Sequence, residues 1–416
     1  MDQFERPELL CPAGDRERLE AAVLYGADAV YLGGKEFGMR SAPANFDGDE
    51  LAEAVSFCHS RGVRVHLTCN TLPRNDELPR LPAFLETAES AGVDALIIAD
   101  LGVLRAAQTY APHVDIHMST QAGTVNYATA NAFHDLGVKR VVMAREVSLD
   151  DIAEIRAKTP KTLELECFVH GAMCMSFSGR CLLSNYLADR DANRGECAQP
   201  CRWKYKLTEE RRPGQSFEIT EEPSGTFIMN SQDMCMIEHI PELLAAGVDS
   251  FKIEGRAKSA FYVAAVTNAY RTAIDGYRKN PSPAYQPEPW IVEETKKISY
   301  RDYCTGFYFG PPSDDAHIYY DGIYIRNWDV MADVKSCDGN TLTVTQRNRF
   351  FEGDTFEVLT PGRKPFSIRA DELYNADGER IAVAPNPMAE IRILVRDGLP
   401  ADLPEGSILR MPVRSN

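Results

Sequence analysis

The stretch AGVDALIIAD, residues 91–100, joins the end of a predicted helix to a short apolar run. The same junction recurs as YGADAVYLGG at 25–34, LGVKRVVMA at 136–144 and AGVDSFKIEG at 246–255. In each copy a glycine ends an amphipathic segment, and apolar or β-branched residues follow that glycine. The pattern is a weak internal repeat of helix and strand units.

Runs of this kind predict eight strands in the first two thirds of the chain. They are ELLCPAG (8–14), ADAVYLGG (27–34), VRVHLTCN (63–70), VDALIIAD (93–100), VDIHMSTQA (114–122), VKRVVMARE (138–146), LELECFVHG (163–171) and VDSFKIEGR (248–256). Strands that alternate with helices form a parallel sheet that helices cover, and eight such strands close a TIM-type (β/α) barrel. An open, doubly wound α/β sheet is the alternative.

Length and patterning predict a second domain. The 416 residues exceed what one hydrophobic core usually supports. Prolines in PSPAYQPEP (281–289) interrupt the repeat, and short strand-like runs follow beyond about residue 328. We therefore expect a barrel over residues 1–280, a linker with a short helix over 281–327, and a small all-β barrel over 328–416.

Composition restricts the partners and the compartment. The net charge of −16 argues against indiscriminate nucleic-acid binding, so any RNA contact must be local. No apolar run is long enough to cross a bilayer. No apolar signal segment precedes ERPELLCPAG, which predicts a cytoplasmic protein with reduced thiols.

A cysteine-rich loop, residues 166–235, is predicted to leave the barrel after the seventh strand. Four of its cysteines have the spacing C-x6-C-x15-C-x3-C, with glycines nearby; they are Cys174, Cys181, Cys197 and Cys201. Glycine permits the irregular backbone that lets thiolates converge on one metal centre. Because structural zinc usually takes two short cysteine knuckles and only one is present, the spacing favours an iron–sulfur cluster over zinc. Disulfides are the third interpretation.

Polar residues follow the predicted strands, where a barrel places its ligands. They are Asn70, Asp100, Ser119, Gln121, Arg145, Glu146, His170, Glu254 and Arg256. Charges of both signs at one rim suit a polar, anionic small substrate. Each residue also has a structural interpretation: helix caps, ion pairs such as Arg145 with Glu146, or a packed histidine at 170.

Basic and aromatic residues alternate within the same loop. Residues 180–212 hold eight arginines and lysines, among them Arg180 and Arg194, together with Trp203 and Tyr205. Arginine binds phosphate and aromatic rings stack on bases, so the segment is a candidate grip for single-stranded RNA. The alternative is a solvated loop whose charges neighbouring acidic residues offset. A weaker candidate patch in the last domain comprises Arg347, Arg349, Phe350, Phe351, Arg363 and Lys364.

The chain resembles the family catalogued as collagenase-like peptidases. The resemblance rests on ELLCPAG, GADAVYLGG, the run from Glu166 to Ser184, NRGECAQPCRW and SFKIEGR, and it covers nearly the whole chain. Length and layout are most similar to the members that hydroxylate the wobble uridine of tRNA to 5-hydroxyuridine. The resemblance implies oxygen-independent tRNA hydroxylation that depends on prephenate and a [4Fe–4S] cluster.

The same resemblance implies roles for individual residues. The family's cluster cysteines correspond to Cys174, Cys181, Cys197 and Cys201, with Cys235 as an alternative to Cys201. We assign the prephenate carboxylates to arginines, because a guanidinium pairs with a carboxylate through two hydrogen bonds. The expected residues are Arg40, Arg145 and Arg256 for prephenate, and Ser119, Gln121, His170 and Glu254 for substrate ordering and proton transfer. The loop after Arg180, with Arg194, and the C-terminal β-domain are expected to bind the anticodon arm.

Other functions stay open at this stage. A peptidase lacks support, since neither a G-x-S-x-G elbow nor an H-E-x-x-H pair is present and a cysteine that holds iron is not a free nucleophile. Hydroxylation of another RNA or of a quinone precursor, and a non-catalytic cluster-bearing role, are further alternatives. A paralogous partner or a homo-oligomer is compatible with each of them.

Overall fold

The computed structural model describes most of the chain. It describes residues 7–39, 44–173, 181, 183–190, 196–200, 221–222, 225–226, 230–310, 317–318, 324–400 and 402–414. Among these residues, no helix is both long enough and apolar enough to cross a membrane.

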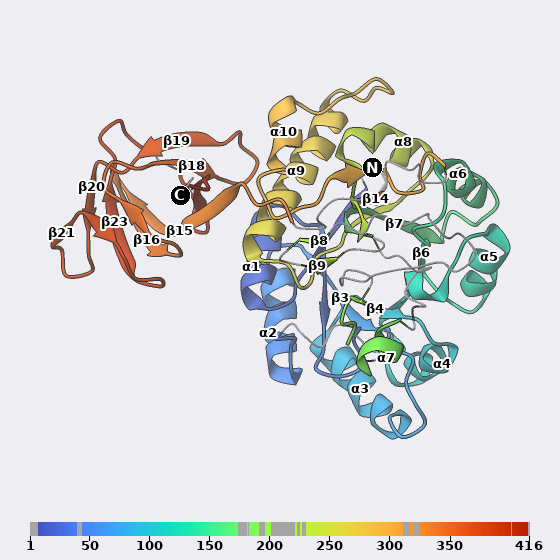
Figure 1. Cartoon of the computed structure of the whole chain (residues 1–416). Helices are drawn as coiled ribbons and strands as arrows, with labels where there is room; N and C mark the ends of the chain where they lie inside the picture. The colour runs from blue at the N-terminus through green and yellow to red at the C-terminus, as the bar shows by residue number, and fades with distance from the viewer. Residues whose placement is uncertain are drawn as a thin grey trace.

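Eight parallel strands close into a barrel (Figure 1), which confirms the predicted TIM-type fold and excludes the open sheet. The closure is the pairing of β7 with β12, where Glu166 lies opposite Ser250. All eight predicted runs form barrel strands. The strands are β1 (Glu8–Pro12), β2 (Ala29–Gly33), β3 (Arg64–Cys69), β4 (Ala95–Ile98), β5 (Asp115–Met118), β6 (Arg140–Val142), β7 (Glu164–Ala172) and β12 (Ser250–Ile253).

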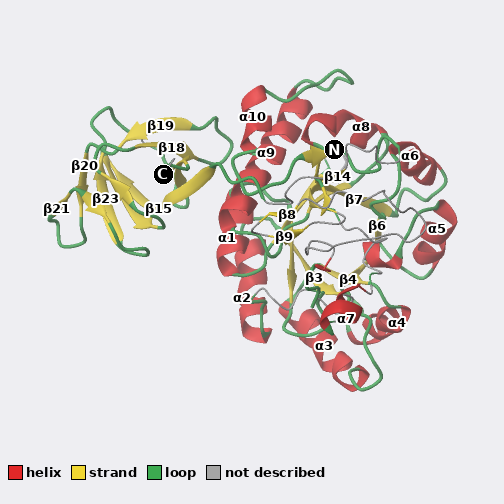
Figure 2. Ribbon diagram, viewed as in Figure 1, coloured by secondary structure: helices red, strands yellow, loops and turns green. Residues whose placement is uncertain are grey.

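Helices follow the strands and surround the barrel (Figure 2). They are α1 (Arg16–Leu24), α2 (Gly48–His59), α3 (Leu81–Ala91), α4 (Leu101–Tyr110), α5 (Tyr127–Asp135), α6 (Leu149–Ala157), α8 (Ile240–Ala245) and α9 (Ala260–Lys279). Their ends follow from the sequence: Asp47 and Glu50 form a capping box at α2, and Gly92 ends α3 with a φ of 75°. The main hydrophobic core lies between these helices and the outward side chains of the strands.

The barrel interior holds a network of buried charges beside a small apolar cluster. Arg140, 1% exposed, donates hydrogen bonds to the carboxylates of Glu8, Glu164 and Glu166. Lys252 donates a second bond to Glu166, with a 2.7 Å distance between Nζ and Oε1. Burial is the largest single influence and raises the pKa of Glu8, but the charge and hydrogen bond of Arg140, together with the charges of His66 and Arg64, outweigh it and hold this pKa well below its usual value. Glu8 and Glu166, whose pKa values are both lowered, therefore stay ionised inside the barrel.

Two histidines lie in the same interior. The rings of His66 and His117 pack edge to face with centroids 4.7 Å apart, and both residues are buried. Burial lowers the pKa of His66 to about 4. Burial and then the charge of Arg140 lower the pKa of His117 well below its usual value. Both imidazoles are therefore neutral in the folded protein at neutral pH.

We predict that acid destabilises this barrel before its carboxylates titrate. The unfolded chain protonates both histidines below about pH 6.5, whereas the fold keeps His66 neutral down to about 4. Stability is therefore fully present above about pH 6.5 and falls as the pH decreases towards about 4. Urea unfolding at about pH 7.5 and about pH 5 should differ by roughly 2 kcal/mol for each buried histidine. In the double variant His66→Gln and His117→Gln this pH difference should shrink; an unchanged difference would contradict the assignment.

The C-terminal domain is an antiparallel sheet with its own core, as the short strand-like runs predict. The strand order is β19-β18-β24-β15-β16-β23-β20-β21, and β17 (Phe350–Phe351) pairs separately with β22 (Val383–Ala384). The sheet strands are β15 (Trp328–Asp338), β16 (Thr341–Gln346), β18 (Thr355–Leu359), β19 (Phe366–Arg369), β20 (Glu372–Tyr374), β21 (Arg380–Ile381), β23 (Glu390–Leu394) and β24 (Ile408–Pro412).

This domain packs beside α1, α9 and α10 (Pro289–Glu294) of the barrel (Figure 2). The Tyr25 hydroxyl, at the end of α1, lies 3.1 Å from the carbonyl oxygens of both Leu359 and Gly406. Arg410, fully buried, pairs with Glu294 at 2.6 Å. Hydrogen bonding to the backbone and a buried ion pair thus hold the two domains together.

Shorter elements complete the described chain. They are α7 (Leu183–Ala188), β8 (Glu221–Glu222), β9 (Gly225–Thr226), β10 (Asn230–Ser231), β11 (Asp233–Cys235), β13 (Tyr303–Cys304), β14 (His317–Ile318) and single 3₁₀ turns at Leu78–Arg80, Thr120–Ala122 and Ile237–His239.

Candidate functional site at the barrel rim

The chain leaves the barrel rim into the cysteine-rich loop and returns from it at the same point. β11 pairs antiparallel with the last residues of β7, so that Asp233 lies opposite Ala172 and Cys235 opposite His170. On its other side β11 pairs in parallel with β13, which extends the barrel sheet by two strands. Residues 173–232 are therefore an excursion whose two ends are adjacent and held by strand pairing.

Two of the four predicted metal ligands lie in the described part of this excursion. Cys181 is partly exposed, Cys197 is exposed, and neither forms a disulfide. The Cys197 sulfur accepts a hydrogen bond from the backbone N–H of Gln199 at 3.4 Å. The other two, Cys174 and Cys201, lie outside the described residues, as do Arg40, Arg180 and Arg194.

A buried serine brings the two described cysteine segments together. Ser184, in the first turn of α7, is fully buried and follows Cys181 by three residues. Its hydroxyl accepts a hydrogen bond from the backbone N–H of Ala198 at 3.0 Å, next to Cys197. The segment that carries Cys197 is therefore hydrogen-bonded to the segment that follows Cys181.

The cysteines elsewhere in the barrel are packed in its core. Burial raises the pKa of Cys11 and of Cys58 to about 12, and it raises that of Cys69 and Cys167 further. Burial also raises the pKa of Cys235 to about 11, and its sulfur lies 3.9 Å from the hydroxyl oxygen of Tyr270 on α9. These environments favour protonated thiols over the thiolates that bind metals. In the described ranges no three His, Cys, Asp or Glu side chains are grouped to hold a metal ion.

Arg145 and Glu254 form an ion pair across the rim, with 2.8 Å between Nη2 and Oε2. Arg145 also donates to the carbonyl oxygen of Ala172 at 3.1 Å, and its guanidinium carbon lies 3.9 Å from the centre of the Phe168 ring. From the sequence, the alternative to a functional role is an ion pair between Arg145 and its neighbour Glu146. The observed partner instead lies 109 residues away, just after the strand that closes the barrel.

Arg256 lies inside the mouth of the barrel, 3% exposed, and donates to the hydroxyl of Thr68 at 2.9 Å. A Cβ atom at Gly33 would overlap its guanidinium group, so the glycine at the end of β2 leaves room for this arginine. The ends of β2, β3 and β12 thus meet around one cation.

Two other rim candidates serve as caps. The hydroxyl of Ser119 accepts a hydrogen bond from the N–H of Gln121 at 3.3 Å and begins a 3₁₀ turn. The Asp100 carboxylate caps α4 by accepting bonds from the N–H groups of Gly102 and Val103. Hydroxyl and carboxylate side chains at strand ends are common helix caps, so these contacts do not require a catalytic role.

His170 is buried in a group of tyrosines. Its ring lies 5.4 Å from that of Tyr303, 5.6 Å from Tyr270 and 6.0 Å from Tyr262. Burial, with a smaller effect of the nearby Lys258 charge, lowers the pKa of His170 to about 3. Its Nδ1 has no hydrogen-bond partner among the residues described. The sequence did not predict these neighbours, although Tyr262 and Tyr270 lie on one face of α9 at helical spacing.

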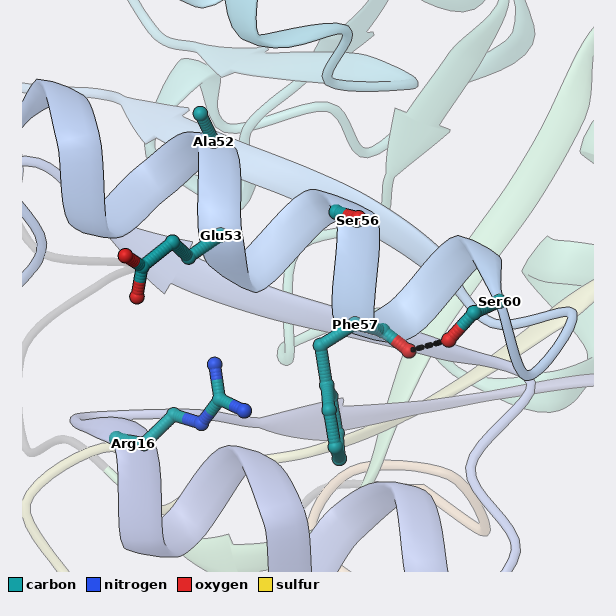
Figure 3. Close-up of a pocket in the computed structure, with 6 residues that line it drawn as sticks. All are labelled: Arg16, Ala52, Glu53, Ser56, Phe57 and Ser60. Atoms are coloured by element: carbon teal, nitrogen blue, oxygen red, sulfur yellow. Dashed lines mark hydrogen bonds between the residues drawn. The ribbon is translucent and has the colours of Figure 1, made fainter.

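Two other parts of the surface, a hollow beside α2 and the basic patch of the C-terminal domain, do not support a binding site. An open hollow of about 530 Å³ lies between α1 and α2 (Figure 3), lined by Arg16, Ala52, Glu53, Ser56, Phe57 and Ser60. It contains none of the predicted site residues. In the C-terminal domain Phe350 is a core residue, and Arg363 is paired with Asp402. These contacts favour the structural interpretation of that basic patch.

Known proteins match the chain along almost its full length. The model of peptidase family U32 matches residues 14–318, and the U32 C-terminal domain matches residues 326–410. The chain is 37% identical to "tRNA hydroxylation protein P1" of Bacillus subtilis (strain 168), over 93% of this chain and 92% of the relative. It is 34% identical to "tRNA hydroxylation protein P" of Escherichia coli (strain K12), over 91% and 92%.

A third relative acts on a different RNA. The "23S rRNA 5-hydroxycytidine C2501 synthase" of Escherichia coli (strain K12) is 32% identical over 92% of this chain but only 57% of its own length.

Proposed function

The chain belongs to peptidase family U32, and from that membership we propose that it hydroxylates RNA: the wobble uridine of tRNA becomes 5-hydroxyuridine, without molecular oxygen and with prephenate as co-substrate. The observation that carries the proposal is the match to two tRNA hydroxylation proteins over more than nine tenths of each chain. The rRNA synthase relative has a longer chain, which makes tRNA the favoured substrate.

The donor set suits a [4Fe–4S] cluster held by Cys174, Cys181, Cys197 and Cys201. Cys181 and Cys197 are free thiols, and the N–H···S bond to Cys197 stabilises negative charge on a sulfur as cluster-binding thiolates require. When bound, such a cluster supplies electron transfer or a ligand site for substrate. Cys235 is the weaker candidate for the fourth ligand, because its thiol packs against Tyr270.

Ser184→Ala is predicted to weaken metal binding while every cysteine is kept. The change removes the acceptor that holds Ala198 beside α7, so the segment of Cys197 loses its link to that of Cys181. Loss of such a supporting contact costs about 10-fold to 100-fold in metal affinity. Iron and sulfide per chain after anaerobic reconstitution, titrated with a competing chelator, measure the effect. Ser60→Ala removes an exposed serine at the end of α2, whose hydroxyl donates to the carbonyl oxygen of Phe57, and should leave iron binding unchanged; equal affinity in both variants would contradict the role of Ser184.

The protein's own groups at the rim would bind and order the substrates. Arg256, with Arg40, is assigned to the carboxylates of prephenate. His170 lies near the end of β7, from which the loop leaves, and Glu254 directly follows the neighbouring strand β12. Within the described part of the chain Nδ1 of His170 has no hydrogen-bond partner, so this neutral ring can hydrogen-bond and order a substrate, whereas its lowered pKa makes it a weak base. Arg180, Arg194 and the rest of the basic segment are assigned to the anticodon arm.

Peptidase activity, which the family label suggests, is disfavoured by the geometry near the cysteine motif. A cysteine nucleophile needs a lowered pKa and a basic partner. The thiol of Cys167 is buried with a raised pKa and faces the hydroxyl of Tyr308, while His170 packs among tyrosines. Neither residue is prepared for attack on a peptide.

Mass spectrometry of tRNA nucleosides tests the proposal. A strain that lacks the gene is expected to lose 5-hydroxyuridine and its derivatives, and a plasmid copy should restore them under anaerobic growth. A strain blocked in prephenate synthesis should show the same loss. If the tRNA nucleosides are unchanged while 5-hydroxycytidine in rRNA is lost, the proposed RNA is wrong. If a quinone precursor is affected instead, the proposed substrate class is wrong. Cleavage of gelatin by metal-free protein would favour the peptidase.

A further inference from the structure

Arg145 connects the three strand ends at the exit of the cysteine-rich loop. It follows β6, donates to the carbonyl oxygen of Ala172 at the end of β7, and pairs with Glu254 just after β12. Ala172 is the last residue of its strand and precedes Cys174 by two positions. The same arginine thus spans the place where the barrel closes and the place where the loop begins.

The surroundings of Arg145 restrict it to this geometry. Its side chain is 13% exposed and that of Glu254 is 20% exposed, so both are largely removed from water. The Phe168 ring supports the guanidinium plane at 3.9 Å and lies 5.5 Å from Nζ of Lys252 in the barrel interior. A planar guanidinium bonds two acceptors and stacks on a ring at the same time, which an ammonium group does not.

We infer that Arg145 is a positioning residue: it fixes the direction in which the chain leaves β7 towards the cysteine-rich loop, rather than binding a substrate carboxylate. The inference rests on the proposed function and deepens it, because it assigns to Arg145 a role other than the prephenate contact that the sequence suggested. Nη1 and Nη2 of Arg145 already donate to the Ala172 carbonyl and to Glu254, so a substrate carboxylate at this arginine would have to share a cation whose charge Glu254 already balances. Arg256 and Arg40 then remain as the anion-binding arginines.

Hydrogen exchange and metal binding together test this role. In metal-free Arg145→Gln, the peptide over residues 168–173 should exchange about tenfold faster than in the wild-type protein, because β7 loses its bond to the rim. Iron affinity should fall by about tenfold, and the absorbance and EPR spectra of the remaining cluster should change. The KM for prephenate of the loaded fraction should stay within about twofold while kcat falls. Arg145→Lys should give intermediate values, and it serves as the second variant if Arg145→Gln does not fold.

The control is Arg105→Gln, which removes an exposed arginine of α4 whose guanidinium bonds a side chain of the same helix, Gln108. Unchanged exchange at residues 168–173 in Arg145→Gln would overturn the inference. So would a KM that rises at least about tenfold with iron content unchanged, because that result identifies a substrate contact. A wild-type protein that binds no iron would refute the proposed function, whereas exchange in metal-free protein still decides the role of Arg145.

Discussion

The Cys181→Ala variant is expected to fold normally and to lose both the metal centre and RNA hydroxylation. Cys181 lies in the excursion between β7 and β11 and is partly exposed, so its removal leaves the barrel core intact. A cluster with one thiolate fewer loses a ligand that holds iron directly. Iron and sulfide per chain should fall to the level of a metal-free control, and 5-hydroxyuridine in a complemented deletion strain should match that of the empty plasmid.

Two further variants separate this result from a general loss of thiols. Cys337→Ala changes a partly exposed cysteine in the C-terminal sheet and should keep wild-type iron content. Cys235→Ala decides the alternative ligand: we expect it to keep its iron, because the thiol contacts Tyr270. Wild-type hydroxylation in Cys181→Ala would refute the ligand assignment, and loss of iron in Cys235→Ala with normal iron in Cys201→Ala would exchange those two residues.

The barrel could be predicted because its information is local. Most units carry a glycine stop such as Gly92, each has an apolar run of the length of a strand, and eight repetitions leave few ways to build the sheet. The charged interior was not predicted. Glu8, Arg140 and Glu166 lie in separate strands, and only closure of the barrel places these three side chains together.

The candidate site was predictable only in part, for related reasons. The four predicted ligands could be chosen from the sequence, because the spacing between cysteines is read directly from the order of residues. The partner of Arg145 is separated from it by 109 residues, and nothing local distinguishes Glu254 from the adjacent Glu146. Helix caps and catalytic groups use the same residue types, so a serine at a strand end fits either role in the sequence. The structure shows that the hydroxyl of Ser119 caps a 3₁₀ turn.

Arg140→Met is expected to be the most destabilising single change in the barrel. Arg140 is 1% exposed and is the shared partner of three carboxylates, with 2.6 Å to Glu164 and 2.8 Å to Glu166. Methionine has a similar length but no charge, so ionised Glu8 and Glu166 would face each other in a low-dielectric interior. Removing one partner from a buried ionic group typically costs about 3–5 kcal/mol. Since a domain is stable by only about 5–15 kcal/mol, the midpoint of urea unfolding should fall sharply.

The control for this variant is Lys158→Met, which breaks an exposed pair with Glu154 of α6 and should cost less than about 1 kcal/mol. Arg140→Met combined with Glu8→Gln should recover part of the loss, because the second change removes one of the carboxylates that lost the charge of Arg140. Recovery would identify uncompensated charge as the cause. If Arg140→Met costs no more than Lys158→Met, or if the double variant is less stable than the single one, the interior network does not contribute to stability as its geometry indicates.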